Sequence, residues 1–162
     1  MQRDKGASIS VEPIGYVHAS RVNVKDDYWG SMESSITLTD AVEPAALDGI
    51  EDFSHAEVLF VLDGVEPDAM VRGARHPRDN PDWPKVGVLA QRGRNRPNRI
   101  GSTIVRVVKR EGRTLYVLEL DAIDGTPVID IKPVMEEFLP REPVRQPQWS
   151  RELMRDYWLP GK

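Results

Sequence analysis

Four arginines lie within eight residues of this chain, in the segment RGRNRPNRIG at residues 92–101. The protein carries 26 acidic and 22 basic side chains, so its formal net charge is −4. A cationic cluster on an acidic background indicates a local site for an anionic or π-rich ligand. Pro97 fixes its own φ and restricts Arg96, and Asn98 can bond its own backbone, so the arginines should point in defined directions. The alternative is a solvated turn whose arginines pair with surface carboxylates.

A second segment, DGTPVIDIKP at residues 124–133, begins with a turn signal and continues as an extended run. Asp130 and Lys132 are two residues apart, which places both on one face of a strand. They form either a salt bridge across that face or part of a ligand site. Because Pro127 and Pro133 bracket the run, we expect it to be an edge or rim strand.

Other catalytic signatures are sparse. His55 precedes an apolar run and is a candidate base, although a lone histidine in such a place is more often structural. The three histidines show no metal-ligand spacing and cysteine is absent, so we expect no metal site, disulfide or thiolate chemistry. No apolar stretch is long enough to span a bilayer and no apolar leader follows Met1. These features predict a cytoplasmic protein that does not insert into membranes.

The rest of the chain must supply the elements that position these segments. At 162 residues it is long enough for one domain with its own core. Short runs of β-branched and apolar residues, separated by 13 prolines and 12 glycines, favour strands over a helical bundle. The clearest hairpin joins two alternating runs at residues 102–109 and 114–120. The other predicted strands are at residues 11–18, 34–38, 53–62, 86–90 and 126–131.

The connections carry their own signals. A helical turn is predicted at residues 44–49 and a long proline-containing surface loop at residues 64–85. Residues 139–148 should form an extended arm, followed by a short helix with Ser150 as its cap. The apolar side chains of that helix are expected four residues apart, at Trp149, Leu153 and Tyr157. Such an arm and helix would expose too much apolar surface in a monomer, which predicts packing across a two-fold axis.

These elements predict a mainly β fold in which an antiparallel sheet closes into a small barrel. The long loop, the arm and the short helix are additions to that barrel. We divide the chain into a flexible N-terminus at residues 1–10, a barrel domain at residues 11–138, and the arm with its helix at residues 139–162.

The order of the motifs resembles that of the TsaA-like family over residues 13–133. The resemblance implies a small β-barrel, S-adenosyl-L-methionine (SAM) as the cofactor, and a homodimer with sites near the subunit interface. The family includes the methyltransferase that acts on threonylcarbamoyl-adenosine at tRNA position 37, which makes tRNA the implied substrate. The motifs that carry the resemblance are Ile14-Gly15, FSH at residues 53–55, GVLAQR at residues 87–92, Arg96-Pro97-Asn98, Ile100-Gly101 and residues 124–133.

By the same resemblance, the cofactor site draws on several distant parts of the chain. Arg92 would grip the methionine carboxylate, and Asp63 or Trp29 would stabilise the sulfonium. Backbone groups of residues 118–121 would pair with the adenine edge. The predicted cofactor-binding residues are Tyr28, Trp29, Gly30, Asp63, Gly64, Arg92, Ser102, Leu118, Glu119, Leu120 and Asp121.

The resemblance also implies a catalytic base, because a carbamoylated adenine nitrogen is a poor nucleophile. His55 and Asp130 are the candidates. Residues expected to contact the substrate or to support the site are Arg96, Asn98, Asp124, Thr126 and Lys132.

The chain departs from the family pattern mainly in the arginine segment. It has Gly93, Arg94 and Asn95 in the middle of that segment and Arg99 where the family has a second proline. Two alternatives therefore stay open. One is a methyltransferase of the same fold that acts on a small-molecule acceptor, and the other is a non-catalytic nucleotide- or RNA-binding module.

Overall fold

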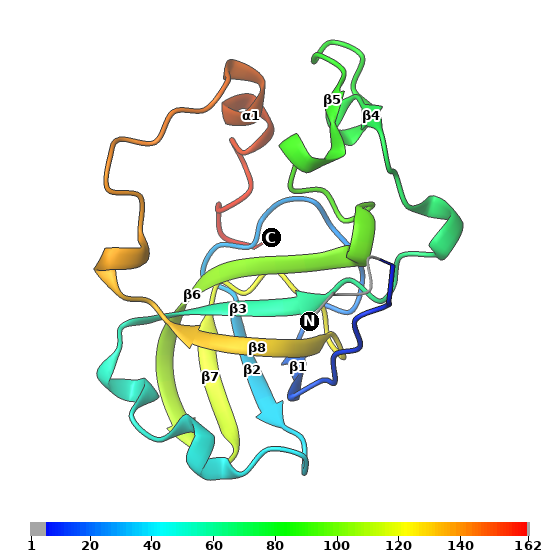
Figure 1. The fold of residues 1–162 in the computed structure, drawn as a ribbon. Helices are drawn as coiled ribbons and strands as arrows, with labels where there is room; N and C mark the ends of the chain where they lie inside the picture. The colour runs from blue at the N-terminus through cyan, green and yellow to red at the C-terminus, as the bar shows by residue number, and fades with distance from the viewer. Residues whose placement is uncertain (1–5, 162) are drawn as a thin grey trace.

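The computed structural model describes residues 6–161, and its six longer strands form one closed antiparallel barrel (Figure 1). This confirms the mainly β barrel predicted from sequence. Residues 1–5 of the predicted N-terminal segment lie outside the described residues, and residues 6–10 are exposed. The barrel strands, in their order around the sheet, are β1 (Gly15–Ala19), β2 (Glu33–Leu38), β7 (Thr114–Leu118), β6 (Ile100–Glu111), β3 (His55–Val61) and β8 (Pro127–Pro133).

Alternate residues of each strand fill the barrel interior. In β3, Ala56, Val58 and Phe60 are buried, while the residues between them face outward. The apolar run at residues 53–62 is therefore a strand with one buried face, because only one face of a barrel strand meets the core. Other strands contribute fully buried side chains to the same core, among them Val17, Ile36, Val105, Leu115, Val117 and Val128.

Strand β8 closes the barrel because it pairs with β3 along one side and with β1 along the other. The prediction of an edge strand at residues 126–131 is therefore wrong. The contact with β1 is short, since only Gly15 and Tyr16 have partners in β8. The two prolines that suggested an edge lie at the two ends of the strand, where a missing N–H costs little.

The predicted loop at residues 64–85 contains one strand of a second, two-stranded sheet. In it, β4 (Ala74–Arg75) pairs with β5 (Val86–Gly87). The strand predicted at residues 86–90 ends after two residues, because the chain turns into the 3-10 helix η5 (Val88–Ala90). Figure 1 shows this small sheet projecting from the same end of the barrel as the C-terminal helix.

The remaining turns are short 3-10 helices, several of which begin with a proline whose fixed φ suits a first helical position. The helical turn predicted at residues 44–49 is confirmed as η1. Together with η2 it buries Leu47 and Ile50 against the barrel core. These helices are η1 (Pro44–Leu47), η2 (Ile50–Asp52), η3 (Pro67–Ala69), η4 (Pro77–Asp79), η6 (Pro97–Arg99) and η7 (Glu136–Phe138).

The C-terminal helix α1 (Gln148–Leu153) begins at a proline cap, and Ser150 lies inside it. The Ser150 hydroxyl donates to the Pro147 carbonyl at 2.8 Å, so the prediction that Ser150 caps the helix is wrong. Tyr157 lies beyond the helix, in a segment that returns to the barrel. That segment approaches Gly30 so closely that a Cβ there would overlap the Trp158 carbonyl. Among the described helices, none is long and apolar enough to cross a membrane.

Gly101 is required for close packing against a buried aromatic ring. It pairs with Phe60 across β6 and β3, and a Cβ on Gly101 would overlap the Phe60 ring. We expect Gly101→Ala to lower the free energy of unfolding by about 1–3 kcal/mol, because the buried ring must shift to admit the methyl group. Guanidinium unfolding measures this change.

Gly87→Ala is the matched control, because a Cβ at Gly87 meets nothing within 4 Å. We expect its free energy of unfolding to stay within about 0.5 kcal/mol of that of the parent protein. Equal unfolding midpoints for the two variants would contradict the packing role of Gly101.

Candidate functional site

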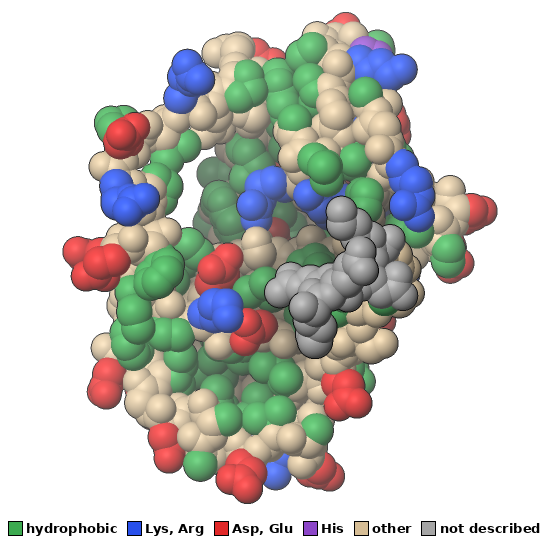
Figure 2. All heavy atoms as spheres, viewed as in Figure 1, with side chains coloured by type: hydrophobic (Ala, Val, Ile, Leu, Met, Phe, Trp, Pro, Cys, Tyr) green, Lys and Arg blue, Asp and Glu red, His purple; other side chains and the backbone are tan. Residues whose placement is uncertain are grey.

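A pocket of about 1210 Å³ opens at the end of the barrel (Figure 2). Its lining includes three parts of the chain that are far apart in sequence: residues 62–66 after β3, residues 89–96 around the start of the arginine segment, and several residues between 146 and 157 at the C-terminus. The hollow in Figure 2 lies between the C-terminal segment and the β4–β5 sheet. Ligand pockets usually enclose about 300–1,000 Å³, so this pocket has room for a cofactor and part of an acceptor.

Two arginines of the arginine segment hold the segment in place. Arg96 donates to the Gln91 carbonyl at 2.7 Å, and Arg99 donates to the Val65 carbonyl at 2.9 Å. Asn98 has a φ of 62° and Arg99 has a φ of 52°, so the turn uses left-handed conformations. The segment is therefore fixed in shape, as the proline and asparagine signals predicted.

The other two arginines are directed toward the pocket. Arg92 uses one guanidinium nitrogen to donate to the Ser102 carbonyl at 2.5 Å. The side chain of Arg94 lines the pocket and has no hydrogen-bond or ion-pair partner among the described residues. None of the four arginines forms an ion pair with a carboxylate among residues 6–161, so the surface ion pairs of the alternative are not seen there, although Arg92 and Arg94 are exposed to solvent.

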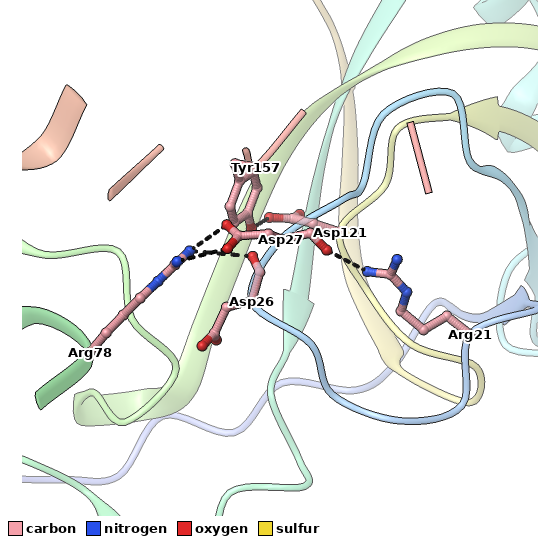
Figure 3. A network of polar contacts seen from close by, with 6 residues as sticks. All are labelled: Arg21, Asp26, Asp27, Arg78, Asp121 and Tyr157. Atoms are coloured by element: carbon pink, nitrogen blue, oxygen red, sulfur yellow. Dashed lines mark hydrogen bonds and ion pairs between the residues drawn. The ribbon is translucent and has the colours of Figure 1, made fainter. Parts of the chain in front are cut away.

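A polar network lies on another wall of the pocket (Figure 3). The Asp121 carboxylate accepts one hydrogen bond from the Thr103 hydroxyl and another from the Tyr157 hydroxyl. Arg78 and Asp27 form a bidentate ion pair with N···O distances of 2.8 and 3.0 Å. Burial, and then the negative charge of Asp121, raises the pKa of Tyr157 far above its ordinary value, so this phenol stays protonated and donates.

The C-terminal segment is docked by bonds at several points. The backbone N–H of Trp29 donates to the Tyr157 carbonyl at 2.8 Å. The indole N–H of Trp83 donates to the Glu152 carboxylate at 2.9 Å and lowers the pKa of that carboxyl. We call residues 147–160 the C-terminal wall, because several of them, from Pro147 to Tyr157, line one side of the pocket.

Some of the predicted site residues come together at the pocket. The Trp29 ring is largely buried, and the guanidinium of Arg21 lies 4.0 Å from its centroid. That ring face is therefore already occupied by a cation. The predicted site residues that line the pocket are Trp29, Asp63, Gly64, Arg92, Arg96, Ser102, Asp121 and Thr126.

Other predicted residues lie outside the pocket lining and have structural contacts. Leu120 is fully buried in the core, and the Glu119 carboxylate accepts from the Ser31 N–H at 3.2 Å. The Asp124 carboxylate accepts from the Ala19 N–H at 3.0 Å. The predicted residues that do not line the pocket are Tyr28, Gly30, His55, Asn98, Leu118, Glu119, Leu120, Asp124, Asp130 and Lys132.

The two candidate bases are among them. His55 is exposed at the start of β3, and its Nδ1 lies 2.7 Å from the Ser54 hydroxyl. Asp130 pairs with Lys132 at 2.5 Å and raises the pKa of that lysine, which is the salt bridge considered from sequence. A base must lie within hydrogen-bond reach of the proton that it removes. Neither residue meets that condition for an acceptor bound in the pocket of the same chain.

Sequence reasoning missed the site roles of Thr103, Arg78 and Tyr157. Tyr157 was assigned to an exposed helix, and its contact with Asp121 spans 36 residues of sequence. Thr103 gave a usable signal, because it is a polar residue at an inward position of an alternating strand. Within residues 6–161, no three acidic or histidine side chains are placed to hold a metal ion.

Comparisons with known proteins identify relatives along most of the chain. A family model described as the tRNA-methyltransferase O N-terminal domain matches residues 18–138. A probable S-adenosyl-L-methionine-binding protein of Pyrococcus abyssi is 36% identical over 142 residues, which cover 85% of this chain and 74% of that protein. The human tRNA (adenine(37)-N6)-methyltransferase is 38% identical over 116 residues, which cover 72% of this chain and 26% of that enzyme.

A solved structure of TrmO from Pseudomonas aeruginosa matches this fold with a TM-score of 0.72 and 25% identity. The match covers 91% of this chain and 64% of the TrmO chain. This chain therefore spans about a quarter of the human relative and just under two thirds of the solved protein. The family model covers most of the barrel, and the pocket-lining residues between 146 and 157 lie beyond its match.

Proposed function

The chain belongs to the family of the tRNA-methyltransferase O N-terminal domain, and on that basis we propose that it is a SAM-dependent methyltransferase. The observation that carries the proposal is the pocket, in which Arg92 and Asp121 supply opposite charges beside apolar side chains. The relatives named as SAM-binding proteins or methyltransferases support the cofactor.

The residues of the pocket fit the chemical groups of SAM, which would supply the methyl group. Arg92 has guanidinium N–H groups that are not used by Ser102 and can form bidentate hydrogen bonds with a carboxylate. Leu62 and the exposed Leu89 offer apolar surface for a purine ring. Because residues 121–123 line the pocket and residues 118–120 do not, we place the adenine beside Ala122 and Ile123.

For the acceptor we propose the N6 atom of adenosine at tRNA position 37, in its threonylcarbamoyl form. In this transfer the N6 lone pair would form the new bond to the methyl carbon, and the electron pair of the broken C–S bond would stay with sulfur. The chain contributes mainly by holding the two reactants in line. The N6 proton must leave, and Asp63 is a pocket carboxylate without a hydrogen-bond partner among the described residues. Asp63 therefore replaces His55 and Asp130 as our candidate to accept it.

Replacing Arg92 tests the cofactor assignment. We expect Arg92→Ala to raise the Kd for SAM about 10–100-fold, because a charged hydrogen-bond anchor is worth about 1.5–3 kcal/mol. Titration calorimetry measures the Kd, and labelled SAM with total tRNA measures methyl transfer, which should fall in parallel. Arg94→Ala removes the same charge from the same segment, and its Kd for SAM should stay within about twofold.

If the parent protein gives neither heat nor a thermal shift with SAM, the cofactor assignment is wrong. If it binds SAM but transfers no methyl group to any tRNA, the binding-module alternative gains support.

A small-molecule acceptor is the second candidate function, and the acidity of the protein favours it. The formal net charge is −4, and Asp26, Asp63 and Glu66 line the pocket together with the arginines. Such a surface repels a polyanion except where an unpaired cation faces it. Arg94 is such a cation in the pocket lining, so it is our candidate for a contact with an RNA phosphate.

Salt dependence separates the two acceptors. For tRNA, we expect Arg94→Ala to weaken binding and to reduce the slope of log K against log [salt] by about 1, as loss of one phosphate contact does. Filter binding of an anticodon stem-loop at several salt concentrations measures the slope. Arg113→Ala at the β6–β7 turn is the control, and it should leave the slope unchanged. Absence of salt-dependent tRNA binding would favour the small-molecule acceptor.

We also propose that the protein is a cytoplasmic homodimer. Figure 2 shows hydrophobic side chains gathered over the barrel face that carries β3, β6 and β8. Ile104 and Val108 on β6 are each about half exposed, and Phe138 in η7 is 86% exposed. Burial of such a surface is what a second copy of the chain would provide.

We expect Phe138→Asp to convert the dimer into a monomer, because a carboxylate would be desolvated in an apolar interface. Sedimentation velocity measures the mass. Val22→Asp, in the exposed loop after β1, introduces the same charge at a side chain of similar apolar character and should leave the mass unchanged. A parent protein that sediments as a monomer at all concentrations would refute the dimer.

A further inference from the structure

The C-terminal wall brings one polar group into the pocket from outside the barrel. The Tyr157 hydroxyl donates to the Asp121 carboxylate, and Tyr157 itself lines the pocket. Its ring is fixed by an edge-to-face contact with Trp158, with centroids 5.0 Å apart. The hydroxyl is therefore held in a defined place.

Asp121 is held from two sides. One carboxylate oxygen accepts from Thr103 on β6, and the other accepts from Tyr157 on the C-terminal wall. Two donors on different oxygens fix both the position and the plane of the carboxylate. A carboxylate has about four acceptor positions, so Asp121 keeps positions for a ligand after these two bonds.

Tyr157 also lies within electrostatic range of one negative and one positive group of the pocket, Asp121 and Arg92. The negative charge of Asp121 helps to raise the pKa of Tyr157, and the positive charge of Arg92 opposes that shift. Arg92 and Asp121 thus supply one positive and one negative anchor around the same phenol. The amino-acid end of SAM needs both, because it carries a carboxylate together with an ammonium and a sulfonium.

We propose that Tyr157 is a positioning residue that fixes the Asp121 carboxylate toward the positively charged part of the cofactor. This inference rests on the proposed cofactor. A carboxylate that is already oriented stabilises a cation without reorganising when the ligand arrives. Asp63 also lines the pocket, but no hydrogen bond to a described residue orients its carboxylate.

The same contact could serve only to dock the C-terminal wall, and the structure allows the two roles to be separated. The wall keeps other attachments when the Tyr157 hydroxyl is removed, namely the Trp83–Glu152 hydrogen bond and the backbone bonds to residues 28–30. Thr103 contacts the same carboxylate from the barrel and has no part in docking the wall.

Three variants of the full chain test the proposal by titration calorimetry with SAM. Tyr157→Phe keeps the ring and removes one hydroxyl, and we expect the Kd for SAM to rise about tenfold, or 1.4 kcal/mol. Thr103→Val removes the second donor from a different element and should weaken binding in the same direction. Trp83→Phe loosens the wall without touching Asp121, and its Kd for SAM should stay within about twofold.

A second ligand separates charge recognition from general damage to the pocket. Methylthioadenosine has the adenosine and the sulfur of SAM but carries no positive charge. In competition with SAM, its Kd should change less than twofold in Tyr157→Phe.

An unchanged Kd for SAM in Tyr157→Phe would overturn the proposal. Equal weakening in Tyr157→Phe and Trp83→Phe, or equal weakening of SAM and methylthioadenosine, would also overturn it. If the parent protein fails to bind SAM, the proposed cofactor is wrong. If the parent and Tyr157→Phe bind SAM equally well, the cofactor stands and only the role of Tyr157 is wrong.

Discussion

Closure of the barrel at residues 124–127 is the constraint on which the pocket depends. The β1–β8 contact has only two residue pairs, so the turn before β8 must supply further bonds. Asp124 accepts from the Ala19 N–H, Gly125 donates to the Val17 carbonyl at 2.8 Å, and Thr126 donates to the Ile123 carbonyl at 2.7 Å. The φ of 81° at Gly125 explains why glycine stands there. Asp121 lies three residues before this turn, so the same bonds fix its place at the end of the barrel.

Only two of the four arginines in the arginine segment are available to bind a ligand. Arg96 and Arg99 are used to satisfy backbone carbonyls, which an irregular turn would otherwise leave unpaired. Arg92 gives one nitrogen to the chain, and Arg94 gives none among the described residues. The cluster is thus partly a structural device, and its binding capacity rests on two side chains. A sequence pattern cannot separate the two roles, because the receiving carbonyls lie on other segments.

The parts of the fold that sequence predicted well are those with local causes. The runs at residues 102–109 and 114–120 alternate and meet at a short turn, so the hairpin of β6 and β7 followed directly. The two-stranded sheet of β4 and β5 has only two residue pairs, which is too short to produce an alternating sequence pattern. The apolar run after His55 predicted a buried strand, but it could not show which residues face the core, because a barrel strand turns alternate residues to the outside.

The site was harder to predict than the fold because its walls meet over long sequence separations. The Trp83–Glu152 bond spans 69 residues, and neither residue belongs to a motif that signals the other.

The resulting pocket has a rigid side and an open side. Asp121 is held by two donors on the rigid side, while Arg94 and Asp63 have no partner among the described residues on the other. A fixed cofactor favours the rigid side, since preorganised groups lose little entropy on binding. An acceptor that must enter, react and leave is better matched to side chains that are free to adjust. The departures of this chain from the family pattern include Arg94, on that open side, so differences in acceptor should arise there while the cofactor contacts stay unchanged.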